Sequence, residues 1–485
     1  MTTCMVYIDI TVLPVALPTI QRDLQVSDLT LHWMINAYTL ALAALLLAGG
    51  KLGRLLGLRT TFCLGITLFT LASALCGMGG SGEAIIAGRA LQGIGGALLL
   101  PTTTPLIFSC FTMNKRGKAT GLNKAIGAVF LCAGPLVGGF LTTYFGWRYV
   151  FWINLPIGVC GLLLALSTLP FFPKKKEPFD IPGFVLFSFG ITSIVLLFMQ
   201  TRVWGWISFP SFFFLVFSVT AFAWLYLRRH RPNATFINFS LILKRSFLIG
   251  TSTLFFTSFV GILIIFFAVY FQTVLGFSAI KAGGYIFIGN SPALISPTLA
   301  GHLIDRYGSR LPLLIGFSLI FVSLLWFSLV LNHANVGLLV PSLALWSFGM
   351  GMIPIAYTLF MLRNVGKHVS SSAIALISTY KQLSSTLGLA LFGALYVFVY
   401  EQNIHFKLSG KTLISQDNLE GVLSRSQNAT QYLDRLPPQE ANDIVQAAKT
   451  ASLHALEYLT LTGTLSVIIP LVIVYVFFKP KNGRA

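Results

Sequence analysis

The run Gly134–Gly158, GPLVGGFLTTYFGWRYVFWINLPIG, decides how the rest of this sequence is interpreted. An apolar segment with Gly134, Pro135, Gly138 and Gly139 comes first, a Phe145–Gly146 pair follows, and a second apolar segment is entered through Trp147 and Arg148. Small residues let helix backbones approach closely in a bilayer, and a proline removes a backbone donor and bends its helix. We therefore predict two membrane helices joined by a tight turn. A glycine pattern this short is, by itself, more often a packing seam with no further role.

The composition is that of a chain that crosses a membrane many times. Of its 485 residues, 55% are hydrophobic and 10% are charged, and the mean hydropathy is +0.80, whereas about one quarter of a soluble domain is charged. The net charge of +19 would also suit nucleic acid, but its distribution assigns it to membrane topology, and we expect no nucleic-acid partner. The six cysteines contain no CxxC pair, so we expect neither disulfides nor a metal site.

Apolar runs of membrane-spanning length recur along the chain. We place fourteen, at 5–20, 31–50, 60–79, 84–108, 120–143, 147–172, 182–200, 208–228, 246–275, 278–301, 311–331, 337–361, 371–399 and 455–478. The first is the weakest, because its length rises only about 24 Å against a hydrocarbon core of about 30 Å.

The basic residues fall on alternate sides of these runs. If both termini are cytoplasmic, the inner loops and the C-terminal tail hold 21 of the 33 Lys and Arg residues, and the short outer loops hold four. This asymmetry follows the positive-inside rule. We therefore expect a multi-pass protein of the inner or plasma membrane with cytoplasmic termini.

An internal repeat suggests two related blocks. Gly50–Arg59 (GKLGRLLGLR) and Gly301–Arg310 (GHLIDRYGSR) share Gly, Leu, Gly and Arg at equal spacing. We expect an N-terminal six-helix half at 1–172, an inserted helix pair with basic linkers at 173–245, and a C-terminal six-helix half at 246–485. The last contains an outer segment, 401–454, with a separate short helix around 438–451. Parallel halves place a substrate site between them near the midplane.

Two of the 14 carboxylates lie inside predicted membrane helices, Asp9 and Glu457. A carboxylate at membrane depth is a candidate functional site, because burying its charge is costly. For Asp9 the alternative is an interfacial residue on a short first helix, and Glu457 we expect to be interfacial.

Five segments resemble motifs of the major facilitator superfamily, in its fourteen-helix drug:proton antiporter branch. The opening run is similar to the fifth-helix antiporter signature and the following WRWxFxINxPIG run. Ile8–Ile20 is similar to LDxTxVNVALPxI, and Gly88–Pro101 to RxxQGxGxA. Tyr380–Ala390 resembles RQxGxxxGxA, with Lys381 in place of the arginine, and Val269–Gly276 resembles YLQxVLG. The resemblance implies an all-α major facilitator fold of two six-helix halves plus two inserted helices, and multidrug efflux by alternating access.

The resemblance also implies roles for individual residues. Asp9 would gain and lose the coupling proton, and Arg89 would favour its charged form when close; the alternative is that Arg89 pins helix ends. The substrate cavity would include Gln92, Lys381 and Gln272, which lie in segments that resemble the family's motifs. Independently of the resemblance, we expect most aromatic residues to face lipid or to pack in the core, and Trp33, Tyr38 and Trp152 are candidates to line the cavity. The helix-packing motif would be Gly134, Pro135, Gly138 and Gly139. Three interior cations (Arg89, Lys124 and Lys381) against one deep carboxylate favour anionic or zwitterionic substrates.

The two repeated loops resemble the superfamily's gating loop, GxLxDRxGRR. The first copy departs from it, because Arg54 replaces the aspartate that latches the halves in the family; the second copy keeps Asp305. The main latch would then lie in the C-terminal half. The expected gating-loop residues are Gly50, Arg54, Gly57, Arg59, Gly301, Asp305, Arg306, Gly308 and Arg310.

Other function classes have little support. No glycine-rich run carries the GK[ST] that holds phosphate, and no catalytic constellation is visible, so we expect a transporter rather than an enzyme. It would need no cofactor, drawing on the proton gradient, and would contact a small-molecule substrate and membrane lipid as a monomer. A Gram-negative host would allow an adaptor and an outer-membrane channel. Two alternatives stay open: a dedicated metabolite, siderophore or organic-acid transporter, and a non-transporting sensor or scaffold.

Overall fold

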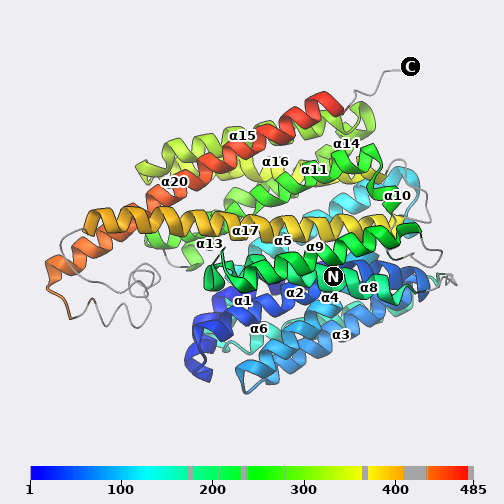
Figure 1. Ribbon diagram of the computed structural model, residues 1–485, viewed down its shortest axis with the longest axis horizontal. Coiled ribbons are helices and arrows are strands. Elements are labelled where there is room, and N and C mark those ends of the chain that lie inside the picture. Colours follow the sequence, from blue (N-terminus) through cyan, green and yellow to red (C-terminus); the bar gives the residue numbers. More distant parts are fainter. Residues whose placement is uncertain are drawn as a thin grey trace.

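Long helices lying side by side make up this protein (Figure 1). The computed structural model describes residues 2–172, 179–205, 207–230, 236, 239–277, 279–362, 370–408, 433 and 435–478. Throughout these residues the backbone forms helices and turns, and no strand is present. Helices satisfy their own backbone hydrogen bonds, which is what a hydrocarbon environment requires.

Seven helices precede the first basic linker: α1 (Thr2–Leu24), α2 (Asp28–Leu55), α3 (Leu58–Met78), α4 (Gly82–Cys110), α5 (Met113–Tyr144), α6 (Tyr149–Trp152) and α7 (Asn154–Thr168). The predicted turn within the opening run is confirmed. Helix α5 ends at Tyr144, and Gly146 has a φ of +96°, a conformation that favours glycine.

Two helices follow the first basic linker, where the inserted pair was predicted: α8 (Ile181–Trp204) and α9 (Phe209–Leu227). The 3₁₀ turn η1 (Arg228–His230) comes after them. The start of α8 is held by Asp180, which is buried. The Asp180 carboxylate accepts from the Gly183 amide at 2.9 Å, from Arg228 Nη2 at 3.3 Å and from the Phe236 amide at 3.3 Å. This one side chain thus caps α8 and ties it to the end of α9.

The remaining elements are α10 (Phe239–Ile242), α11 (Arg245–Gly261), α12 (Leu263–Val269), the π-helix η2 (Tyr270–Val274), α13 (Ala279–Asn290), η3 (Ser291–Leu294), α14 (Ser296–Tyr307), α15 (Arg310–Val330), η4 (Leu331–His333), α16 (Val336–Leu362), α17 (Ser370–Leu408) and α20 (Pro438–Phe477). The prediction of a separate short helix at 438–451 is wrong, because that segment is the first part of α20. No glycine or proline interrupts the chain between residues 439 and 462, so nothing ends the helix where its polarity changes. This part of α20 packs through Ile444 and Ala448 on Tyr400 and Ile404 of α17.

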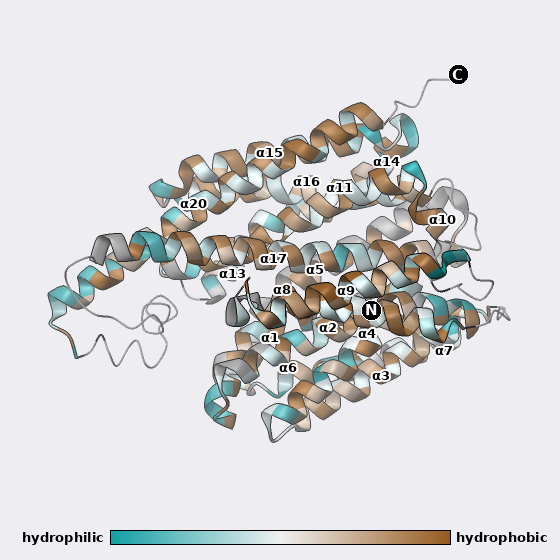
Figure 2. Cartoon of the chain, in the orientation of Figure 1, coloured by the Kyte–Doolittle hydropathy of each residue, from teal (hydrophilic) through white to brown (hydrophobic). Residues whose placement is uncertain are grey.

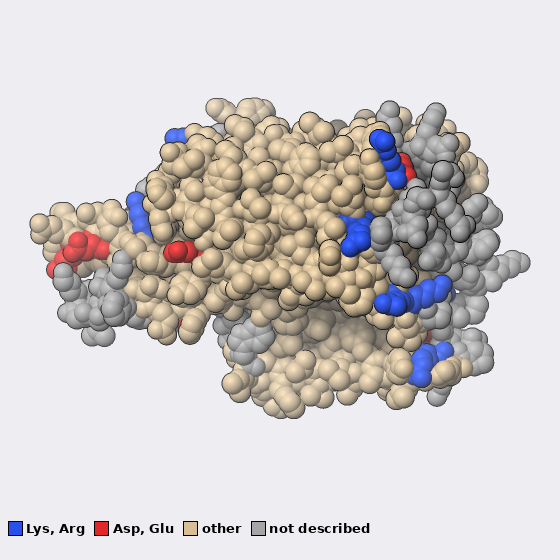
Figure 3. Space-filling model, turned by 90° about the horizontal axis from the view of Figure 1, so that it is seen from above, with Lys and Arg blue, Asp and Glu red and all other residues tan. Residues whose placement is uncertain are grey.

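Hydrophobic residues cover most of the helix lengths, and hydrophilic residues gather mainly at the helix ends (Figure 2). Within the described residues, eleven helices are long and apolar enough to cross a bilayer, and a shorter apolar stretch, Cys4–Leu17, lies in α1. The number of fourteen crossings stays a prediction. On the face shown in Figure 3, Lys and Arg are most numerous at the end of the molecule where α10 lies in Figure 1, the kind of asymmetry that the positive-inside rule describes.

One pattern of helix pairing occurs twice. Before the inserted pair, α1 packs on α5, α2 and α3 pack on α4, and α3 packs on α7. After it, α11 packs on α17, α14 and α15 pack on α16, and α15 packs on α20. The two sets meet where α2 and α4 contact α17 and where α5 contacts α13 and α14, and α8 lies against both α2 and α17.

Candidate functional site

Asp9 on α1 lies at the centre of a buried polar cluster. Its carboxylate is paired with Arg89 of α4, with 2.5 Å between Asp9 Oδ2 and Arg89 Nη1, and each side chain is only 2% exposed. A buried charge is tolerated in a protein interior when a partner compensates it. A snorkelling side chain would be exposed, so the burial of Asp9 does not fit the snorkelling part of the interfacial alternative. The depth of Asp9 in the membrane stays a prediction.

Arg89 has further partners that fix its position. Its Nε donates to the Met34 carbonyl of α2 at 3.1 Å, its Nη1 donates to Gln92 Oε1 at 2.8 Å, and its Cζ lies 4.5 Å from the centre of the Tyr38 ring. Arg89 and Gln92 are three residues apart on α4 and so share a helix face. The Met34 carbonyl lies in the second turn of α2 and not at a helix end, so this contact does not match the alternative that Arg89 pins helix ends. The ion pair has the geometry that a role in coupling requires, and that role stays a prediction.

Two amide side chains and one hydroxyl complete the cluster. Gln92 Nε2 and Asn154 Nδ2 each donate to Asp9 Oδ1 at 3.2 Å and to Ser73 Oγ at 3.0 Å. Ser73 Oγ donates to the Phe151 carbonyl at 2.9 Å. The carboxylate therefore accepts hydrogen bonds from three side chains on two helices.

Ser73 and Asn154 were not among the residues singled out from the sequence. Asn154 lies inside the opening run, in Ile153–Asn154–Leu155–Pro156. A buried amide in an apolar helix needs hydrogen-bond partners, and that requirement is the signal that could have identified it. For Ser73 no comparable signal exists, because serines are common in membrane helices.

Glycines on α4 bring the contributing helices close enough for these short side chains to meet. A Cβ atom at Gly93 would lie 2.5 Å from the Tyr38 carbonyl oxygen of α2, and one at Gly95 would lie 2.8 Å from the Phe69 amide of α3. No larger residue fits without moving a backbone. The glycines that follow Gln92 therefore set the spacing of the site.

The glycines predicted to form a packing seam on α5 lie against α1 at Thr11 and Val12, two and three residues after Asp9. A Cβ at Gly134 would overlap the Thr11 side chain, and one at Gly138 would lie 2.9 Å from the Val12 carbonyl oxygen. Gly139 is half-buried; the side chain of Pro135 lies outside the described residues. The seam therefore controls how closely the helix that carries Asp9 approaches α5.

We expect the Gly138→Ala substitution to destabilise the protein by about 1–3 kcal/mol, the usual cost of overpacking. The new methyl group would meet the α1 backbone, which cannot rotate away. Gly284→Ala on α13 is the matched control, since a Cβ there has no neighbour within 4 Å, and it should be neutral or stabilising. Thermal unfolding of the detergent-solubilised variants measures both. Equal melting temperatures for the two variants would contradict the proposed seam.

The other residues predicted for a substrate cavity lie in varied surroundings. Gln92 and Tyr38 are buried and belong to the environment of the ion pair. Trp33 is half-buried on α2, and Lys381 of α17 and Gln272 of η2 are exposed. None of these last three belongs to the cluster around Asp9.

Arg59 and Arg310, the last residues of the repeated loops, make equivalent contacts. Arg59 Nη2 donates to the Leu166 carbonyl of α7 at 2.6 Å, and Arg310 Nη2 donates to the Tyr475 carbonyl of α20 at 3.0 Å. Each guanidinium also lies over an aromatic ring, that of Phe171 at 4.0 Å and that of Tyr475 at 5.2 Å. Each arginine therefore ties its loop to the last helix of its own block.

The remaining gating-loop residues lie at the helix ends. Gly57 and Gly308 have φ angles of +92° and +82°, so both repeats turn through a conformation that favours glycine. Asp305 and Arg306 are exposed in the last turn of α14, and Arg54 is half-buried in the last turn of α2. Gly50 is buried within α2, and Gly301 is half-buried within α14. A latch at Asp305 stays a prediction.

The C-terminal end of α1 is tied through Asp23 to the turn that follows α5. Asp23 accepts from Trp147 Nε1 at 2.8 Å and from Arg148 Nη1 at 2.9 Å, and Arg148 Cζ lies 4.3 Å from the centre of the Trp147 ring. The hydrogen bonds from Trp147 and Arg148 hold the pKa of Asp23 below its ordinary value of 3.8. Asp23 is therefore charged at neutral pH, and the tie holds one end of the helix that carries Asp9.

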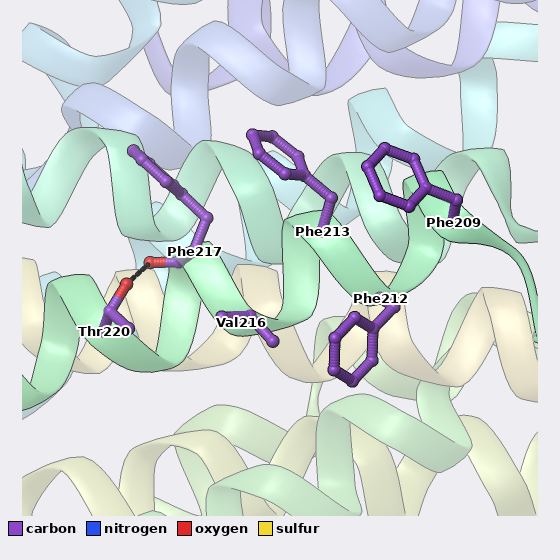
Figure 4. Close-up of a pocket in the computed structure, with 6 residues that line it drawn as sticks. All are labelled: Phe209, Phe212, Phe213, Val216, Phe217 and Thr220. Atoms are coloured by element: carbon purple, nitrogen blue, oxygen red, sulfur yellow. Dashed lines mark hydrogen bonds between the residues drawn. The ribbon is translucent and has the colours of Figure 1, made fainter.

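A surface hollow on α9 has a different character (Figure 4). It is lined by six residues of that one helix: Phe209, Phe212, Phe213, Val216, Phe217 and Thr220. The only polar side chain in it, Thr220, donates to the Phe217 carbonyl at 2.9 Å. The phenylalanines are exposed, as expected of a surface that faces lipid, and we do not assign the substrate site to it.

Comparisons with known proteins agree on one family. Residues 1–389 match the family model described as Major Facilitator Superfamily. The chain is 32% identical to the tetracenomycin C resistance and export protein of Streptomyces glaucescens, over 81% of this chain and 73% of that protein. It is 28% identical to the riboflavin transporter RibZ of Clostridioides difficile, over 82% of this chain and 87% of that protein. It is 26% identical to the multidrug resistance protein Stp of Mycobacterium tuberculosis, over 96% of this chain and 88% of that protein.

A solved structure has the same fold. The proton:xylose symporter XylE aligns with all of this chain, and 95% of the XylE chain is covered, with a TM-score of 0.62. The sequence identity is 14%, so this likeness describes the arrangement of helices and not the substrate.

Proposed function

The chain belongs to the major facilitator superfamily, and on that premise we propose that it is a proton-coupled exporter of small amphiphilic compounds. Two six-helix halves, residues 1–172 and 246–485, would rock against each other in alternating access, with the inserted pair at 173–245 as the remaining two of fourteen crossings. Export is supported by relatives whose names describe export and drug resistance.

The buried ion pair of Asp9 and Arg89 is the observation that carries the proposal. Two charges in a membrane-embedded core are costly to keep and mark coupling sites. When Asp9 is charged, the pair holds α1 and α4 together. Protonation of Asp9 removes the attraction and frees the two helices to separate, so that proton binding is linked to a change in helix packing.

A dedicated metabolite transporter is the second candidate, favoured by the similarity to RibZ, which is named as a riboflavin transporter. The charge of the substrate is open as well. Arg89 is balanced by Asp9, so one of the three interior cations that favoured an anionic substrate is neutralised. Lys381 is exposed, whereas the side chain of Lys124 lies outside the described residues.

The same proposal implies a location, an energy source and partners for the protein. The protein would be a monomer in the inner or plasma membrane with both termini in the cytoplasm, in contact with lipid and one small-molecule substrate. Its energy source would be the proton gradient, without a cofactor. In a Gram-negative host, an adaptor and an outer-membrane channel could extend the export route.

Flux into inverted vesicles tests the proposal. The substrates would be a cationic dye, a carboxylated amphiphile, an organic acid and riboflavin, each with and without a pH gradient. We expect gradient-dependent accumulation of at least one amphiphile, substrate-induced proton movement, and loss of both on adding a protonophore. Equal accumulation with and without the pH gradient would refute proton coupling. Transport of riboflavin and of no other compound tested would favour the second candidate.

A further inference from the structure

The two amide side chains next to Asp9 differ in how firmly their orientation is fixed. Gln92 Oε1 accepts from Arg89 Nη1 at 2.8 Å and lies 3.8 Å from Cys76 Sγ. A rotation that exchanged the oxygen and nitrogen of Gln92 would point an N–H group at the guanidinium. Its orientation is therefore locked as long as Arg89 is in place.

Asn154 is not locked in this way. It is 0% exposed, and both of its hydrogen bonds come from one atom, Nδ2, which donates to Asp9 Oδ1 and Ser73 Oγ. Its other polar atom, Oδ1, is buried and finds no hydrogen-bond partner in the part of the chain that the structure describes. Burying an acceptor without a partner is unfavourable, because the acceptor has lost its hydrogen bonds to water, so the presence of Asn154 at this position calls for an explanation.

The two protonation states of Asp9 make opposite demands on a neighbour. The carboxylate only accepts hydrogen bonds, whereas the carboxylic acid has an O–H group that must donate. Arg89 and Gln92 Nε2 can only donate to it. Ser73 Oγ accepts from two amides and has already committed its proton to the Phe151 carbonyl. Neither Arg89, Gln92 nor Ser73 therefore supplies an acceptor in the present arrangement.

We propose that Asn154 is a two-state partner of Asp9, which donates through Nδ2 to the carboxylate and, after a half-turn of its amide group, accepts through Oδ1 from the carboxylic acid. The inference rests on the proposed role of Asp9 as the proton site. The terminal torsion of an asparagine is broad and roughly two-fold, and oxygen and nitrogen occupy nearly the same volume. The exchange therefore needs no backbone movement. It does require the Ser73 hydroxyl to turn its proton from the Phe151 carbonyl to Asn154 Oδ1, and it moves Nδ2 to the place that Oδ1 now occupies.

The charges around Asp9 are consistent with this assignment. The titratable or charged side chains facing the cluster are Arg89 of α4, Tyr38 of α2, Cys76 of α3, and Tyr7 on α1 itself. Helix α7 contains no charged residue, and α5 meets α1 through Gly134 and Gly138. Of these four side chains, only Arg89 carries a charge opposite to that of Asp9. Asn154 thus acts by hydrogen bonding, as a positioning residue that serves both states.

The test combines infrared difference spectroscopy with flux measurements on the reconstituted full-length protein. The C=O stretch of protonated Asp9 is identified as the acid-induced band that is missing in Asp9→Asn. In Asn154→Leu we expect this band to move to higher frequency, because the acid loses its acceptor, and maximal flux to fall about tenfold, the effect of one hydrogen bond of about 1.4 kcal/mol, with the substrate KM unchanged. In Asn154→Asp the pH midpoint of flux should rise by at least one unit, because two adjacent carboxyl groups share a proton.

A control separates this role from the general loss of a buried amide. Asn290 of α13 is also buried, at 8% exposure, and Asn290→Leu should leave the Asp9 band in place. An Asn154→Leu variant with an unshifted band and a normal pH profile would refute the inference, even if its yield of folded protein fell. If Asn154→Leu does not fold, an unchanged pH midpoint in Asn154→Asp refutes it equally. Full proton coupling in Asp9→Asn would instead refute the proposed proton site, and the inference with it.

Discussion

Replacing Asp9 with asparagine is expected to reduce proton-driven substrate accumulation to the level of vesicles without the carrier. The amide has nearly the shape of the carboxylate, and its one oxygen can take the place of Oδ2 and still accept from Arg89 Nη1. Its NH2 group then replaces Oδ1, the atom that now accepts from Gln92 and Asn154. The amide cannot gain or lose a proton in the physiological range. The variant leaves Arg89 without its counter-charge, so we expect it to be less stable than the unmodified protein. It also lacks the titratable group that links proton binding to helix packing.

Asp23→Asn provides a matched control for this experiment. Asp23 is on the same helix and is also hydrogen-bonded to an arginine, but at the exposed C-terminal end of α1, where its partner is Arg148. That variant should retain proton-coupled flux while it lowers the melting temperature. If Asp9→Asn transports with unchanged proton stoichiometry, the coupling carboxylate lies elsewhere. Glu457, which is 3.6 Å from His454 on α20, would then be the next to test.

The fold class could be predicted from the sequence because bilayer-spanning helices need long apolar runs, and such runs contrast strongly with charged loops. The residue at which α20 begins could not be predicted in this way. Residues 438–454 are polar, so hydropathy separated them from the last apolar run. Helix formation depends on the absence of breakers more than on polarity, and this segment has none. Hydropathy thus indicates where a helix meets lipid and not where it begins.

In the candidate site, too, some residues could be identified from the sequence and others could not. Asp9 and Arg89 stood out because charges inside apolar runs are rare. Their pairing across 80 residues depends on how α1 packs against α4, which spacing along the chain does not encode. Ser73 and Asn154 are neutral and were overlooked. Their importance comes from burial beside a charge, a property of the tertiary structure alone.

Replacing Arg89 with methionine is expected to destabilise the folded protein by about 3–5 kcal/mol, the cost of removing one partner of a buried ion pair. Methionine fills a similar volume without a charge or donors. Asp9, at 2% exposure, would keep two amide donors but lose its counter-charge, and Gln92 Oε1 would lose its charged donor. Thermal unfolding in detergent across pH measures the effect. The deficit should shrink in acid, because protonation of Asp9 removes the uncompensated charge.

The double variant Asp9→Asn/Arg89→Met distinguishes an unpaired charge from a simple packing defect. If the charge of Asp9 is what destabilises Arg89→Met, removing that charge should restore much of the lost stability, and the two substitutions should be non-additive by about 1 kcal/mol or more, as expected for residues in contact. Flux should stay absent, since no titratable group returns. Additive losses would instead mean that Arg89 stabilises the protein mainly by tying α4 to the Met34 carbonyl of α2. The coupling role would then rest on Asp9 alone. Recovery of folding without recovery of transport is the outcome that only a coupled pair predicts.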